Sequence, residues 1–171
     1  LMRRILISLL ALLCMASCGR RRNAPAQEAA ADSRPRVFLP AIAPSSLSPD
    51  ERRDYLRVHY WDRFDFTDTL FTVRADTLQM VEAYARYIAL ISDRPTDGSP
   101  IDSLMRRASS SRKMLDYFSM LAEQVLHDPN SPLRNDEFYI PVLQAQLRSP
   151  WYDEYERIAP QYDLEMAMQN R

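Results

Sequence analysis

Four side chains that can ligate a cation recur at steps of three residues between positions 59 and 68. They are His59, Asp62, Asp65 and Asp68. Steps of three or four residues place side chains on one side of a helix. Imidazole nitrogens and carboxylate oxygens suit borderline or hard cations. Together with Trp61, these residues form a candidate binding segment for a small ligand or a metal ion, although the pattern assigns no definite metal site.

A structural interpretation of the same segment is favoured over the ligand site. Phe64 and Phe66 flank Asp65 in alternation, and the preceding helix is expected to end nearby. Aspartate side chains after a helix end readily accept hydrogen bonds from the backbone of the next segment. We therefore expect an aromatic wedge in the core, with Asp65 and Asp68 capping the next segment or pairing with arginine.

The rest of the sequence contains no set of residues to which we assign catalysis. His127 follows Glu123 by four residues, which places both on one helix face. Pro129 indicates that His127 simply ends a helix. Ser110 begins a serine-x-x-lysine match, but the chain lacks the lysine-threonine-glycine motif that would accompany it. A hydrolase built on paired carboxylates remains a third hypothesis, because acidic residues are plentiful in expected first turns of helices, where the helix dipole also accounts for them.

Composition excludes several classes of function. The 171 residues include only two glycines, Gly19 and Gly98, so glycine-rich loops that cradle phosphates are absent from the sequence. Without Arg3 and Arg4, 20 of the 22 basic side chains remain against 23 acidic ones, a net charge near −3. Nucleic-acid binding needs a basic face. We expect neither a nucleic-acid partner nor a cofactor.

The N-terminal residues predict a lipoprotein signal peptide over positions 1–17. Arg3 and Arg4 form a positive start, and the apolar run that follows is much shorter than the ~20 residues of a membrane-spanning helix. Cys18 comes directly after the small residues of the cleavage point, so its thiol is expected to carry a lipid. Cys14 would leave with the signal peptide. The mature domain would then contain neither a disulfide nor a free thiol.

Residues 18–46 are expected to form the lipidated cysteine and a semi-extended tether. Prolines recur in this stretch and deny it a continuous helix. Gly19 rather than aspartate follows Cys18, which favours the outer membrane, and Arg20 opens a run of three arginines that favours contact with anionic headgroups. We expect a cell-envelope protein facing the periplasm. The apolar piece 37–42 is suited to dock onto the folded domain.

Residues 47–171 are expected to fold into one all-α, bundle-like domain of six or seven helices. Ser48 and Glu51 form a capping box that opens a helix reaching about Trp61. Apolar residues at three- and four-residue steps mark a helix near 74–92. Further helices are predicted from the sequence signals at Ser99-Pro100, Met114 to Val125, Asn135, Ser149-Pro150 and Ala159-Pro160.

Two motifs resemble a family of uncharacterised helical domains found in lipoproteins of Gram-negative bacteria. One runs from Tyr55 to Thr69, around His-Tyr-Trp-Asp-x-Phe-Asp-Phe, and the other runs from Asp128 to Leu143. The resemblance covers roughly residues 40–171. In that family the helical domain commonly stands ahead of a thioredoxin-like domain with a Cys-x-x-Cys, after an Asn-Arg pair. This chain stops at Asn170 and Arg171, so we expect either a stand-alone form or a truncated reading of a longer gene.

The expectations for function follow from the anchor and the resemblance. The first is a lipid-anchored helical interaction or accessory module that works with a thioredoxin-like domain or protein and is no enzyme by itself. The alternative is a small-ligand or metal-binding lipoprotein that uses His59 to Asp68. That alternative requires the side chains of His59, Asp62 and Asp65 to converge on one point.

Overall fold

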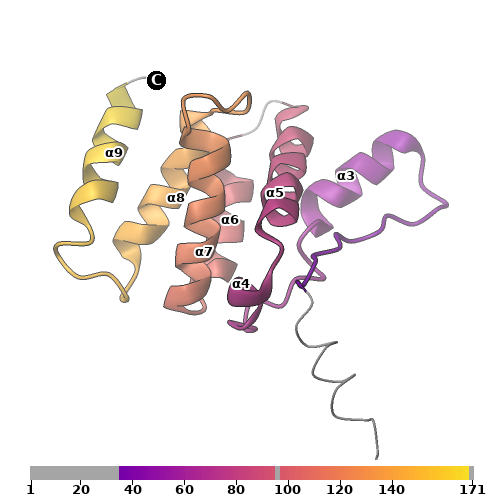
Figure 1. The fold of residues 1–171 in the computed structure, drawn as a ribbon. Helices are drawn as coiled ribbons and strands as arrows, with labels where there is room; N and C mark the ends of the chain where they lie inside the picture. The colour runs from indigo at the N-terminus through magenta and orange to yellow at the C-terminus, as the bar shows by residue number, and fades with distance from the viewer. Residues whose placement is uncertain (1–34, 95–96, 170–171) are drawn as a thin grey trace, which may run out of the picture. The chain divides into compact units, whose positions relative to one another are not determined.

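The computed structural model describes residues 35–94 and 97–169, which fold as an all-α domain of seven helices (Figure 1). The signal peptide, Cys18 and the first part of the expected tether lie outside the described residues. In chain order the elements are α3 (Pro49–His59), α4 (Phe71–Arg74), α5 (Thr77–Ser92), α6 (Ser99–Ala108), α7 (Arg112–Ala122), the π-helical turn η1 (Glu123–His127), α8 (Asp136–Arg148) and α9 (Ile158–Gln169).

Polar side chains cap four of the described helices, two of them at the positions that the sequence predicts. At α3 the backbone N–H of Ser48 donates to Glu51 Oε2 at 2.8 Å, and the Ser48 hydroxyl accepts from the backbone of Glu51. Asn135 caps α8 by accepting from the backbone N–H of Phe138 at 3.2 Å. Such caps bind amides that have no partner within the first helical turn. The predicted helices beginning at Ser48 and Asn135 are confirmed.

Two segments differ from the expected pattern of helices. Ala75 is extended and pairs with Arg36, so the helix expected near 74–92 starts only at Thr77, and the short helix α4 precedes it. Ser149-Pro150 opens no helix, because Ser149 is also extended and its hydroxyl accepts from the backbone N–H of Trp151 at 3.1 Å. The chain instead turns through this stretch. Helix α9 begins at Ile158, next to the predicted start at Ala159-Pro160.

The core is built mainly from α5, α6, α7 and α8, with large side chains that have almost no exposed surface. Tyr84 and Phe118 are the largest of these. Phe38 joins them with 3% of its surface exposed, so the predicted docking of the piece 37–42 takes place through Phe38, whereas Val37, Leu39 and Ile42 stay exposed. The compact unit accordingly begins at Pro35, before the expected domain boundary at residue 47.

Gly98 allows α6 to start very close to α8. A Cβ atom at this position would lie 2.5 Å from Cγ of Pro141 and 3.0 Å from the carbonyl oxygen of Glu137. The backbone of Gly98 has a φ of −71°, which any residue can adopt. The glycine therefore serves close approach between two helices and not an unusual backbone conformation.

The helices form a row in which α3 and α9 lie at opposite edges (Figure 1). α3 packs against α5, and α9 packs against α8. No helix in residues 35–94 or 97–169 is long and apolar enough to cross a membrane.

Candidate functional site

The candidate segment 59–68 leaves α3 in a series of turns and inserts its aromatic side chains into the core. Trp61, Phe64 and Phe66 are each at most 7% exposed. The Trp61 ring stacks on Phe38 with 4.7 Å between centroids, and Phe64 meets Phe118 edge-on at 5.2 Å. These contacts connect the extended segment around Phe38, the turns after α3 and helix α7, as expected for an aromatic wedge.

The two candidate ligands at the end of α3 bind each other. His59 Nδ1 lies 2.6 Å from Asp62 Oδ2, and the His59 ring stacks on Tyr55 at 4.2 Å. Asp62 Oδ1 accepts from Arg107 at 3.4 Å. The same guanidinium donates to the Trp61 carbonyl at 3.0 Å and lies 4.4 Å from the centre of the Phe66 ring. This polar group therefore fastens α6 over the aromatic turns.

Asp65 and Asp68 are occupied by the backbone and by an arginine. Asp65 Oδ1 accepts from the backbone N–H of Thr67 at 2.8 Å and from its hydroxyl at 2.6 Å. These hydrogen bonds, the hydroxyl first, lower the pKa of Asp65 below its usual range. Asp68 accepts from the backbone N–H of Leu70 at 3.1 Å and forms an ion pair with Arg36. Both carboxylates thus cap the next segment, as the structural interpretation predicts.

The structure does not assemble the cation site that the three-residue spacing suggested. Within the described part of the chain, no three histidine, cysteine or acidic side chains gather closely enough to hold a metal ion. The reason is that α3 ends at His59, so the helical periodicity that would align the later carboxylates no longer applies. The side chains of His59, Asp62 and Asp65 therefore do not gather as the metal-binding form of the alternative function requires.

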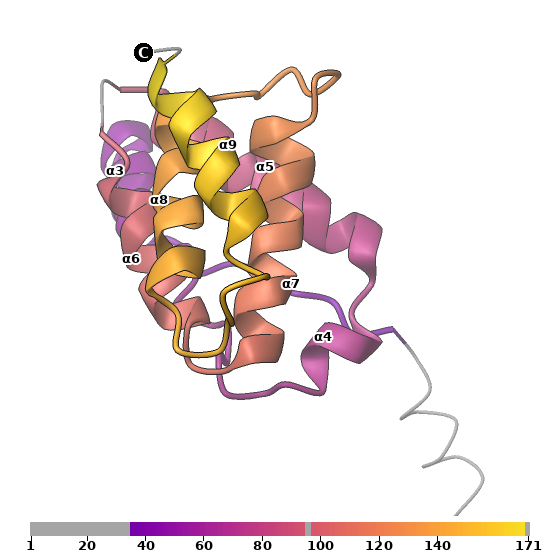
Figure 2. The same ribbon diagram turned by 90° about the vertical axis from the view of Figure 1, so that its left-hand side faces the viewer.

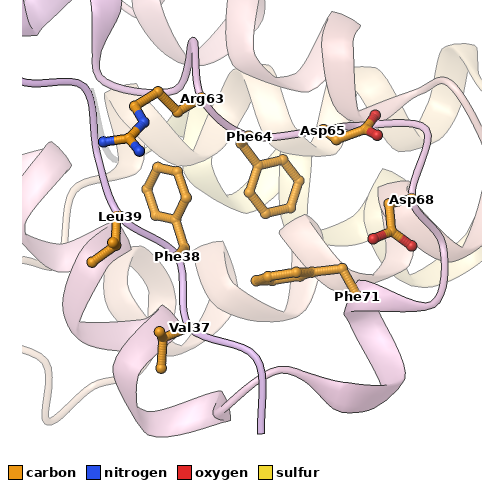
Figure 3. Close-up of a pocket in the computed structure, with 8 residues that line it drawn as sticks. All are labelled: Val37, Phe38, Leu39, Arg63, Phe64, Asp65, Asp68 and Phe71. Atoms are coloured by element: carbon orange, nitrogen blue, oxygen red, sulfur yellow. The ribbon is translucent and has the colours of Figure 1, made fainter. Parts of the chain in front are cut away.

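A hollow of about 270 Å³ lies beside this segment (Figure 3). Val37 and Leu39 lie on one side, and Asp65 and Asp68 lie on the other, with phenylalanine rings between them. Its one basic side chain is that of Arg63, which is exposed and has no ion-pair partner among the described residues. No local pattern in the sequence predicts this hollow, because its two sides are more than twenty residues apart in the chain.

A second hollow, of about 340 Å³, lies at the end of the π-helical turn. His127 lines it and stacks on Tyr139 with 4.7 Å between ring centroids. Its Nδ1 atom is buried and has no hydrogen-bond partner in the described part of the protein. The π-helical turn η1 ends at His127, with Asp128 as its C-cap, as Pro129 predicts. The residues that line the two hollows include no serine, threonine, cysteine or lysine.

The largest pKa shifts belong to tyrosines of the core. Burial raises the pKa of Tyr87 and of Tyr117 to about 12 in each case. Burial also raises the pKa of Tyr84, Tyr139 and Tyr152. These shifts move the hydroxyls further from neutral pH, whereas a general acid or base works best with a pKa near the working pH. The shifts therefore reflect packing.

Three comparisons with known proteins complete the description. A family model described as a domain of unknown function, DUF5106, matches residues 17–170. The chain is also similar to the crystal structure of a thioredoxin-like protein from Bacteroides caccae ATCC 43185, with 36% sequence identity and a TM-score of 0.67. That match covers 79% of this chain and 49% of the other, so this chain spans about half its length. No curated protein matches the chain.

Proposed function

We propose that this chain, which belongs to the DUF5106 family, is a helical interaction module that works with a thioredoxin-like domain or protein. In this proposal the module has no turnover of its own. A lipid on Cys18 anchors it to the cell envelope, on the periplasmic side of the outer membrane.

The observation that supports a thioredoxin-like partner is the similarity of this chain to about half of a thioredoxin-like protein. Thioredoxin-like redox sites use a Cys-x-x-Cys beside a βαβ unit. The only cysteines of this chain are Cys14 and Cys18, which are four residues apart, and the described residues contain helices and no βαβ unit. We infer that the thioredoxin-like part of the other protein lies in the half that the match leaves uncovered, and that a helical half similar to this chain accompanies it there.

The contacts of the candidate residues support a non-catalytic role. His59 and Asp62 bind each other, and Asp65 and Asp68 serve the backbone and Arg36. Trp61 is 3% exposed in the aromatic core. A catalytic residue must reach a substrate atom, and these side chains are instead engaged in maintaining the fold.

The partner is tested by titrating the full-length chain, in detergent micelles, with the uncovered half of the Bacteroides caccae protein. We expect saturable heat of binding by calorimetry. The chain alone should not reduce the disulfides of insulin, whereas the probe should. Failure of an active probe to bind would contradict the partnership, and insulin reduction by the chain alone would contradict the lack of catalysis.

The anchor is supported by the sequence around Cys18, where a positive start and a short apolar run precede small residues and the cysteine. In a Gram-negative host, the full-length chain should partition into the detergent phase of Triton X-114 and sediment with outer membranes. Cys18→Ser should move the protein out of the detergent phase. Cys14→Ser, four residues away within the signal peptide, is the matched control and should leave the partitioning unchanged. Equal behaviour of the two variants would overturn the anchor.

A further inference from the structure

Helix α9 carries apolar side chains on two opposite faces. Pro160 and Ala167 are at the inner face and are buried. Ile158, Tyr162 and Met166 recur at steps of four residues on the other side, and they are 63%, 62% and 42% exposed. A helix at the edge of a globular domain ordinarily has one apolar face and one polar face. α9 therefore has an apolar surface that the described part of the chain leaves uncovered.

The position of α9 leaves this outer face accessible. α9 is the outermost helix of the row and packs against α8. Figure 2 looks at that edge and shows α9 in front of α8, with no other described element crossing it. Tyr155, just before the helix, is 80% exposed and adds a second exposed tyrosine to this edge. We call Tyr155, Ile158, Tyr162 and Met166 the α9 surface.

We propose that the α9 surface is where the thioredoxin-like partner docks. This inference rests on the proposed function and adds the location of the contact. Tyrosine and methionine are enriched in protein interfaces, where they supply large contact areas. An exposed row of such side chains, set on a rigid helix, suits a folded partner that packs against it.

Charge favours this partner over a second copy of the same chain. The residues 150–169 include five acidic side chains and one basic side chain. Of the acidic ones, Glu154 and Glu165 are exposed near the α9 surface. Packing two copies of this edge together would bring like charges close to each other, which suppresses association. The same acidic character disfavours contact with anionic lipid headgroups.

Val37, Leu39 and Ile42 are also exposed on the extended segment before α3, but no other helix in the described part of the chain carries a comparable row. Leu78 on α5 is 70% exposed and Val58 on α3 is 73% exposed, but each is the one large exposed hydrophobic residue on its helix. Single exposed apolar side chains are ordinary features of protein surfaces. Leu78 therefore provides a matched control, because it has similar exposure and lies on a different helix.

The test compares binding of the thioredoxin-like probe to the wild type, Tyr162→Ser, Ile158→Ser and Leu78→Ser by calorimetry. Because Tyr162 and Ile158 are largely exposed, all variants should keep the helical circular-dichroism spectrum and unfold cooperatively. We expect Tyr162→Ser and Ile158→Ser each to weaken binding about tenfold or more, as at interface hot spots. Leu78→Ser should bind within about twofold of the wild type.

The outcomes separate this inference from the proposed function. No binding by the wild-type chain would overturn the proposed partnership itself. Binding by the wild type that is equally strong in the two α9 variants would leave the partnership intact and overturn the docking surface. Dimerisation of the wild-type chain that Tyr162→Ser abolishes would also overturn it, because the α9 surface would then bind a second copy.

Discussion

The segment 59–68 and the helix α9 differ in how well their sequence patterns indicate a binding surface. The segment has the spacing of a ligand site, yet its aromatic residues are buried and its polar residues bind one another or the backbone. α9 has no chemical motif, yet it exposes tyrosine, isoleucine and methionine in a row. Polar residues that follow a helix end readily form hydrogen bonds within the chain itself and are then not available to a ligand. An apolar row without cover is the stronger indication of a contact surface.

The two tryptophans allow the largest test of this comparison. Trp61 is 3% exposed in the core and Trp151 is 45% exposed before α9. Trp61→Ala should lower the free energy of unfolding by about 3–5 kcal/mol, because it removes a large buried side chain and leaves a cavity. Trp151→Ala is the matched control and should cost clearly less. Urea denaturation measures both values, and equal losses would contradict the assignment of the segment to the core.

Alkaline pH should destabilise the core next most strongly. Burial raises the pKa of Tyr87 to about 12, above the ordinary value of 10. The folded state therefore favours the neutral phenol, so this contribution to stability is complete below pH 10 and is lost as the pH rises from 10 towards 12. Tyr87→Phe removes the ionisable group and should flatten this loss. Urea denaturation between pH 8 and 11.5 tests it, and identical profiles for the two proteins would contradict the prediction.

The smallest effect concerns the polar caps of the segment. Asp68→Asn keeps an oxygen for the backbone of Leu70 but removes the charge that pairs with Arg36. Since both side chains are partly exposed, the loss should be at most about 1 kcal/mol and should shrink at high salt. Asp65→Asn is the control, since Asp65 caps Thr67 and has no arginine partner in the described part of the chain. Urea midpoints at two salt concentrations measure both, and a larger effect at Asp65 would contradict these roles.

Local signals in the sequence predicted most helices but not the tertiary contacts. Ser48 and Asn135 are caps whose partners lie three residues away, so their role is visible in the sequence. The four-residue helix α4 is too short for a periodic signal. The hollow beside Arg63 depends on Val37 and Leu39, which reach it only through the fold. Long-range placement of this kind arises from packing, which local spacing does not encode.

The candidate cation ligands show that a regular local pattern can also predict a site that the fold does not form. His59, Asp62, Asp65 and Asp68 have regular spacing, but spacing predicts convergence only while the backbone stays helical. The helix ends at His59, and the following turns redirect each side chain. The sequence predicted a helix that begins at Ala159-Pro160, but it assigned no exposed apolar face to that helix. Which side would be covered depended on the position of α9 at the edge of the domain.

Amide hydrogen exchange of the full-length chain, measured with and without the thioredoxin-like probe, distinguishes the α9 surface from the segment 59–68 as the place of contact. We expect the probe to slow exchange of backbone amides in residues 155–169 and to leave residues 55–69 unchanged. Protection that falls on residues 55–69 and not on α9 would contradict it, because the segment assigned to the core would then be the contact surface. Unchanged exchange throughout the chain, at probe concentrations that saturate an active partner, would contradict the partnership itself.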